Sequence, residues 1–170
     1  MRSVPLVLGV LASGRGSNLQ AILDSIENDA GRTLLYDSLP IDAGMVGNYR
    51  MRFQLYSVAG NEGSYDARQA VLSGADGVVF LADAQPERLT DNQASFDELT
   101  VALTGLHKAS ATFPVVIQYN KVDLVDEATL DTVRRALNSE GLPETFSSAL
   151  NKRGVVDSLQ SITRLVAQSL

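Results

Sequence analysis

Two short segments of the chain are apolar at every position, and they limit the possible folds more than any other feature of the sequence. They are Val78-Val79-Phe80-Leu81 and Val115-Val116-Ile117. A strand with one buried face alternates apolar and polar residues, whereas a strand of a parallel sheet is covered on both faces and is apolar throughout. Because parallel strands need helical crossovers, the two segments predict an α/β fold with helices on both faces of the sheet.

The rest of the chain alternates in the way that such a fold requires. Strands are predicted at 5–11, 33–41, 51–58, 77–82 and 113–119, with a weaker one near 145–147. Hydrophobic residues at helical spacing cover 19–26, 96–106, 130–137 (after Asp126, an expected N-cap) and 155–166, and a short helix is expected at 65–72, before Gly74. Turn-forming residues at 42–48 indicate a hairpin. This order predicts a three-layer sandwich with a mostly parallel sheet of about six strands and one antiparallel edge hairpin, in one domain spanning residues 1–170.

Composition excludes several classes of function. The chain has 20 acidic and 14 basic residues, so its net charge of −6 argues against binding to nucleic acid or to an anionic membrane surface. The absence of cysteine excludes disulfides, thiol catalysis and thiolate zinc sites, and a single histidine, His107, excludes histidine-rich metal sites. The longest apolar run, residues 5–12, is too short to span a bilayer and lacks a signal-peptide cleavage pattern, so we expect a cytoplasmic protein.

A glycine-rich segment, residues 9–17, joins the first predicted strand to the first predicted helix. Free backbone N–H groups and the positive end of a helix dipole bind phosphate in such a loop. Gly9 and Gly14 fit the phosphate-loop pattern G-x-x-x-x-G-K-[ST]. However, Arg15 replaces the lysine, and Gly16 replaces the hydroxyl residue that binds magnesium, with Ser17 one position later. A strand–helix turn without a ligand is therefore the alternative interpretation.

A second motif, Asn120-Lys121-Val122-Asp123, comes directly after the fifth predicted strand. At the carboxyl end of a strand, N-K-x-D is the guanine-reading element of small GTPases. The carboxylate pairs with the ring N1–H and the exocyclic amine, the lysine stem covers the base, and the asparagine ties loops together. Ser147-Ser148-Ala149 follows the next strand, where these proteins contact the base through a serine–alanine turn. Polar turns without a ligand are the alternative for both segments.

From about residue 32 onward the chain resembles a Ras-like small GTPase, and more closely the bacterial MglA-like branch that controls cell polarity and gliding. The segments that carry the resemblance are 32–42, 52–60, 77–85 and 118–124, with Asn18-Leu19-Gln20 after the phosphate loop. The resemblance implies a P-loop GTPase fold that binds GTP or GDP with Mg²⁺. It also implies a regulatory role, with a roadblock-type regulator or a polarity effector as protein partner.

The resemblance further implies roles for individual residues. Arg32 matches a built-in catalytic arginine, and Asn61 stands where the family keeps a glutamine that orients water. Thr33 matches the threonine that senses the γ-phosphate, and Ser17, Thr33 and Asp37 are the implied magnesium contacts. The implied nucleotide-binding set is Gly9, Gly14, Arg15, Gly16, Ser17, Thr33, Gly60, Asn120, Lys121, Asp123, Ser148 and Ala149.

Departures from the family pattern predict that GTP hydrolysis is slow or absent. The phosphate loop has lost its lysine and the adjacent hydroxyl, and Asn61 is one methylene shorter than glutamine. The stretch from Arg15 to Arg32 is also shorter than its counterpart, which would trim the first switch. Phosphoryl transfer depends on positioned charge and metal. Two functions therefore stay open: a switch that binds GDP and GTP, and a pseudo-GTPase that binds no nucleotide and acts through a protein partner.

Residues 10–22 also resemble the phosphate loop of glycinamide ribonucleotide formyltransferases. Those enzymes need an Asn–His–Asp catalytic group in mid-chain, and the one histidine here lies at the end of a predicted amphipathic helix. We interpret this likeness as convergence on phosphate-binding chemistry, and we expect no formyl transfer.

Overall fold

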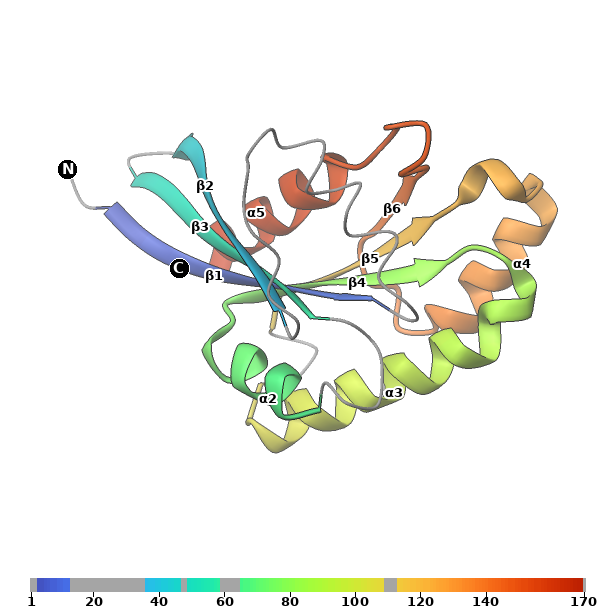
Figure 1. Cartoon of the computed structure of the whole chain (residues 1–170), viewed down its shortest axis with the longest axis horizontal. Helices are drawn as coiled ribbons and strands as arrows, with labels where there is room; N and C mark the ends of the chain where they lie inside the picture. The colour runs from blue at the N-terminus through green and yellow to red at the C-terminus, as the bar shows by residue number, and fades with distance from the viewer. Residues whose placement is uncertain (1–2, 13–35, 47–48, 59–64, 109–112, 170) are drawn as a thin grey trace.

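The computed structural model describes residues 3–12, 36–46, 49–58, 65–108 and 113–169 (Figure 1). Within these ranges the elements follow one another as β1 (Ser3–Ala12), β2 (Tyr36–Val46), β3 (Tyr49–Val58), α2 (Tyr65–Gly74), β4 (Gly77–Asp83), η2 (Pro86–Arg88), α3 (Leu89–Gly105), β5 (Val115–Asn120), η3 (Val122–Leu124), α4 (Glu127–Leu137), β6 (Glu144–Ser147) and α5 (Asp157–Ser169). The helix expected at 19–26 lies outside the described residues.

The described strands form one six-stranded sheet in the order β2-β3-β1-β4-β5-β6. β1 pairs in parallel with β3 and β4, β5 pairs in parallel with β4 and β6, and β2 is the antiparallel edge strand beside β3. Figure 1 shows α2 and α3 on one face of the sheet and α5 on the other. The predicted three-layer α/β fold, with a mostly parallel sheet and one edge hairpin, is confirmed.

The hairpin turns later than the sequence pattern predicted. Residues 42–48 were expected to form the turn, but β2 continues to Val46 and β3 begins at Tyr49. The pairing register shifts between Asp42 and Gly44, which marks a bulge in β2. Glycine and aspartate are typical of turns, and they are also accepted at a bulge, so composition could not separate the two. Helix α2 likewise includes Gly74, although we expected it to end before that residue.

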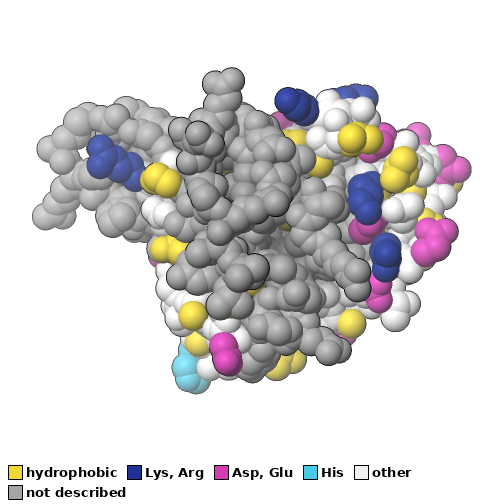
Figure 2. Space-filling model, in the orientation of Figure 1, with side chains coloured by type: hydrophobic (Ala, Val, Ile, Leu, Met, Phe, Trp, Pro, Cys, Tyr) yellow, Lys and Arg dark blue, Asp and Glu magenta, His cyan; other side chains and the backbone are white. Residues whose placement is uncertain are grey.

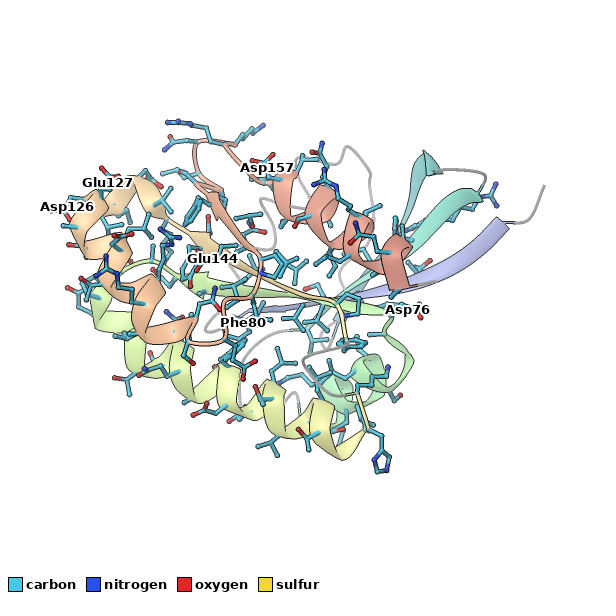
Figure 3. All side chains as sticks on the ribbon, turned by 180° about the vertical axis from the view of Figure 1, so that it is seen from behind. Asp76, Phe80, Asp126, Glu127, Glu144 and Asp157 are labelled. Carbon is cyan, nitrogen blue, oxygen red and sulfur yellow. The ribbon has the colours of Figure 1, made fainter. Side chains whose placement is uncertain are left out.

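The centre of the sheet is buried on both faces, as the two apolar segments predicted. Every residue of β4 and β5 is buried. On one face Phe80 of β4, which is labelled in Figure 3, meets Phe96 of α3 edge to face, with ring centroids 5.1 Å apart. On the other face a Cβ added at Gly77 would lie 2.8 Å from Val166 and 3.0 Å from Ile162, so α5 packs directly against the backbone of β4. Both faces are therefore closed by helices.

Helix α4 begins where its N-cap was expected. The Asp126 carboxylate accepts a hydrogen bond of 2.8 Å from the Thr129 backbone N–H. Hydrogen bonding by the Thr129 side chain, and next by its backbone N–H, holds the pKa of Asp126 below its ordinary value. Val133 and Leu137 are buried against the core, whereas Arg135 is exposed. None of the helices in the described ranges has the length and apolar character that crossing a bilayer requires.

Candidate functional site

The last residues of three neighbouring strands lie side by side at the carboxyl edge of the sheet. Asp83 ends β4, Asn120 ends β5 and Ser147 ends β6; the register pairs Asp83 with Asn120, and Asn120 with Ser147. All three side chains are buried. Ligands of open α/β sheets bind outside the carboxyl ends of the strands, so this row forms the floor of the expected site.

The Asn120 carboxamide connects two loops at this edge. Its Oδ1 accepts one hydrogen bond from Ser147 Oγ and one from the Ala149 backbone N–H, each 3.0 Å long. Its Nδ2 is buried and has no hydrogen-bond partner within the described residues. A buried donor without an acceptor costs about 1–3 kcal/mol. This nitrogen is suited to donate to a ring nitrogen of a bound base.

A buried chain of polar side chains supports Asn120 from below. Gln118 Nε2 donates to Ser147 Oγ at 2.8 Å, and Ser158 Oγ at the start of α5 donates to Gln118 Oε1. The three residues are each 1% exposed. Because each of them has a partner, the network fixes the end of β5 relative to β6 and α5.

Lys121 and Asp123 follow on the outer side of this row. Lys121 has φ 64, in the left-handed region, and it immediately precedes η3, which contains Asp123. Lys121 Nζ forms an ion pair with Asp83 Oδ2 at 2.6 Å. The Asp123 side chain is exposed and makes no hydrogen bond or ion pair with any other described residue. Its two carboxylate oxygens can therefore accept two N–H donors of a ligand.

The loop after β6 is held closed by backbone contacts. Ser148 and Arg153 exchange two backbone hydrogen bonds of 3.0 Å, and Asn151 donates to Ser148 Oγ. Gly154 has φ +68, and a Cβ there would lie 2.0 Å from the Phe146 carbonyl oxygen. Ala149 N–H, a predicted base contact, is already directed at Asn120. The turn is thus formed, and its Ala149 N–H contributes to the site by binding Asn120 Oδ1.

The remaining predicted residues are divided between described and undescribed parts of the chain. Gly9 lies inside β1, where it pairs with Tyr56 and Val78, and a Cβ there would be 3.5 Å from Val71, an ordinary contact distance. Asp37 is in β2 opposite Ser57 of β3, near the carboxyl end of β3. The other predicted residues lie outside the described residues: Gly14, Arg15, Gly16, Ser17, Arg32, Thr33, Gly60 and Asn61.

The predicted magnesium site depends on this undescribed part. Of its expected ligands, Ser17 and Thr33 are not described, and Asp37 is described only through its backbone pairing. In the described ranges there is no group of three or more His, Asp or Glu side chains arranged to hold a metal ion. The described residues therefore include the base end of the expected site and not its phosphate end.

A second polar cluster lies between β6 and α4. Glu144, which is labelled in Figure 3, accepts hydrogen bonds from Tyr119 Oη (3.1 Å), Arg134 Nη2 (2.6 Å) and Asn138 Nδ2 (2.9 Å). Burial alone would raise the pKa of Glu144, but these three hydrogen bonds outweigh burial and lower it. Burial, with the Glu144 charge, raises the pKa of Tyr119 above its ordinary value. Phe146 stacks on Tyr119 with ring centroids 5.8 Å apart. The cluster fixes β6 against α4.

The surface around this end carries both signs of charge. Figure 2 shows basic and acidic side chains intermingled where α4 and β6 lie. In α4, Asp131 forms ion pairs with Arg134 (3.0 Å) and Arg135 (3.2 Å). The charges on α4 therefore partly offset one another at this end of the molecule.

Two residues at the site were not predicted from the sequence. Asp83 and the fully buried Asn92 of α3 are hydrogen-bonded to each other at the end of β4. Asp83 could have been predicted as a site residue, because it is a charged residue that directly follows an apolar strand segment. Asn92 has no local signal, because its buried position becomes evident only when α3 is packed on the sheet.

The chain is similar to two proteins of known name. It is 38% identical over 169 residues to the mutual gliding-motility protein MglA of Myxococcus xanthus, and the alignment covers 92% of this chain and 86% of that protein. It is 25% identical over 122 residues to the small COPII coat GTPase SAR1 of Giardia intestinalis, covering 71% of this chain and 61% of that protein. No family model matches the chain. The first likeness extends far beyond any single motif.

Proposed function

Because the chain belongs to the MglA branch of the Ras-like small GTPases, we propose that it is a regulatory protein that binds GDP and GTP and hydrolyses GTP slowly or not at all. The sheet that the structure describes is that of a P-loop GTPase. The observation that carries the proposal is the assembled base end: three strand ends in register, with Asp123 exposed beside them.

The chemistry of these groups fits guanine better than adenine. The two Asp123 oxygens can accept from the N1–H and the exocyclic amine of guanine, whereas adenine has an acceptor at N1 and no amine at C2. Asn120 Nδ2, buried and unpaired within the described residues, can donate to the ring N7. The aliphatic stem of Lys121 supplies an apolar surface beside the base. When bound, the nucleotide would supply the phosphates and Mg²⁺ would neutralise part of their charge.

The expectation of slow hydrolysis rests on the sequence of the phosphate end. Arg15, Gly16 and Asn61 stand where the pattern has lysine, a hydroxyl residue and glutamine. A forked guanidinium does not reproduce a point-charge ammonium, and glycine offers no magnesium ligand. The same substitutions favour the second candidate, a pseudo-GTPase that acts only as a protein-interaction module. For either candidate the likeness to MglA supports a protein partner, such as a roadblock-type regulator or a polarity effector.

Calorimetric titration with GDP, GTP and ADP, each with and without Mg²⁺, tests the proposal. We expect binding of GDP and GTP and none of ADP. The absence of binding at near-millimolar GDP and GTP would contradict the proposal and favour the pseudo-GTPase. Single-turnover hydrolysis of bound GTP then measures the rate; hydrolysis as fast as that of a GTPase with an intact phosphate loop would contradict the second half of the proposal.

Asp123→Asn tests the base contact directly. The amide keeps one acceptor and gains a donor, so it matches the carbonyl at C2 of xanthine instead of the amine of guanine. We expect GDP affinity to fall about 100-fold, for the loss of roughly one hydrogen bond to a charged group, and xanthosine diphosphate affinity to rise. Asp131→Asn, on the outer face of α4, is the matched control. Unchanged GDP affinity in Asp123→Asn would show that the base does not bind there.

A further inference from the structure

The ammonium group of Lys121 is paired with a carboxylate that the N-K-x-D motif does not include. Lys121 Nζ lies 2.6 Å from Oδ2 of Asp83, the last residue of β4. The Asp83 side chain is 8% exposed and that of Lys121 is 33% exposed. The carboxylate therefore lies in the floor of the site and the lysine lies above it. This contact sets the direction in which the Lys121 side chain runs.

Asp83 is itself held from two sides. The Gln85 backbone N–H donates to Asp83 Oδ1 at 3.1 Å, which leaves Oδ2 for the lysine. From α3, Asn92 binds both backbone groups of Asp83: its Oδ1 accepts from the Asp83 N–H at 3.1 Å, and its Nδ2 donates to the Asp83 carbonyl at 2.8 Å. Asn92 is fully buried, so no water competes for these bonds. The end of β4 is thereby fixed to α3.

Stability alone does not account for this arrangement. A partly exposed ion pair contributes little to folding, because solvent screens it and the cost of desolvating the carboxylate offsets the attraction. Lys121 also has φ 64, a conformation that costs free energy for a residue with a side chain. The ion pair with Asp83 and the left-handed backbone conformation both belong to Lys121, and neither of them adds much to stability. Such a combination is typical of a side chain whose position serves a ligand.

We propose that Asp83 and Asn92 are positioning residues of the guanine site. Asn92 fixes the backbone of Asp83, and the Asp83 carboxylate holds the Lys121 ammonium so that the aliphatic stem lies along the face of the base. Neither residue touches the nucleotide, and both act through Lys121. This inference rests on the proposed function, because it requires a base beside Asp123. It extends the site from the loops into α3.

A double-mutant cycle on GDP affinity tests the proposal. Calorimetry is carried out on the full chain as wild type, Asp83→Asn, Lys121→Met and the double variant. We expect Asp83→Asn to weaken GDP binding about tenfold, a coupling of the size found between residues in contact. In the Lys121→Met background the same substitution has no further effect, because the group that Asp83 positions is gone. Asn92→Ala, placed in the same cycle, is expected to behave in the same way.

Asp91→Asn is the matched control. Asp91 directly precedes Asn92 in the chain, and its exposed carboxylate forms an ion pair with Arg88. Removing this charge is expected to leave GDP affinity unchanged. Circular dichroism and thermal unfolding of each variant separate misfolding from loss of affinity. If Asp83→Asn does not fold, Asp83→Glu is used in its place. The longer glutamate side chain displaces the Lys121 ammonium, so the same coupling with Lys121→Met is expected.

The outcomes separate this inference from the proposed function. Losses that add in the double variant would mean that Asp83 does not act through Lys121, and they would overturn the positioning role while GDP binding stands. A wild-type chain that binds no GDP would overturn both. The inference would be supported if the coupling energy between Asp83→Asn and Lys121→Met is nearly as large as the loss of GDP affinity in Asp83→Asn alone.

Discussion

At the scale of single residues, two glycines share an unusual backbone conformation and differ in their surroundings. Gly141 has φ +70 and Gly154 has φ +68, but a Cβ at Gly141 meets nothing within 4 Å, whereas one at Gly154 would lie 2.0 Å from the Phe146 carbonyl oxygen. The first position requires glycine only for its conformation. The second also requires it because the loop after β6 folds back on the strand.

Substituting each of these two glycines with alanine is expected to lower the free energy of unfolding by different amounts. Gly141→Ala is expected to cost about 1 kcal/mol, for backbone strain alone. Gly154→Ala is expected to cost about 3 kcal/mol, because overpacking adds to the strain. Urea unfolding of both variants measures the difference. Equal losses would mean that the loop accommodates the added methyl group by moving.

Glu144 makes stability depend on pH. Burial opposes its charge, but hydrogen bonds from Arg134, Asn138 and Tyr119 leave its pKa below the ordinary 4.5. A carboxyl whose pKa is depressed by folding stabilises the folded state fully above the unfolded pKa, and this contribution is lost as the pH falls through the folded-state pKa. Wild type should therefore exceed Glu144→Gln in unfolding free energy at neutral pH.

That difference should shrink below pH 4.5 and vanish at lower pH. Urea unfolding of wild type and Glu144→Gln across this range measures it. Glu87→Gln, at an exposed position of η2, is the control and should show no such convergence. A difference that stays constant with pH would mean that Glu144 contributes through packing and not through its charge.

At the scale of elements, α2 is capped by a residue far away in the sequence. Its last turn contains no basic residue. Lys108, beyond the end of α3, donates from Nζ to the backbone carbonyls of Leu72 (2.7 Å), Ser73 (2.9 Å) and Ala75 (2.6 Å). A cation at a helix C-terminus satisfies carbonyls that have no intrahelical partner and interacts favourably with the dipole. Burial lowers the pKa of Lys108, which the nearby Asp76 charge opposes.

Lys108→Met is expected to destabilise the chain by about 1–2 kcal/mol and to loosen α2 selectively. Hydrogen exchange should show faster exchange of amides in α2, with amides of α4 unchanged. Arg135→Met is the control: its side chain is 83% exposed, and its ion pair with Asp131 is worth less than about 0.5 kcal/mol. Uniform loss of protection in both helices would mean that Lys108 contributes to global stability and not to the cap.

The contrast between local and distant contacts also explains what the sequence could predict. The apolar segments around Phe80 and Ile117 predicted strands buried on both faces, and Asp126 predicted the start of α4, because both signals are local. The bulge between Asp42 and Gly44 was predicted as part of a turn, because the same residue types suit both. A contiguous motif predicted Asn120, Lys121 and Asp123 as base contacts, and this role stays a prediction. Asp83, Asn92 and Lys108 act across packed elements, and no spacing in the chain announces them.

At the scale of the whole molecule, nucleotide binding should be visible as stability. A ligand that binds only the folded state stabilises it by mass action, by about 2.7 kcal/mol at a free concentration of 100 times its Kd. We expect GDP to raise the unfolding temperature of the wild-type chain and ADP to leave it unchanged. In Asp123→Asn most of the rise should be lost at the same GDP concentration. Equal stabilisation by GDP and ADP would indicate phosphate binding without recognition of the base.

The position of β1 in the sheet has a consequence for synthesis on the ribosome. β1 emerges before both of its neighbours, β3 and β4, because they are translated later. The edge that pairs with β4 therefore stays unsatisfied until Asp83 has left the exit tunnel. The apolar side chains of β1 stay exposed in the nascent chain until then, and chaperones bind exposed apolar segments of this kind.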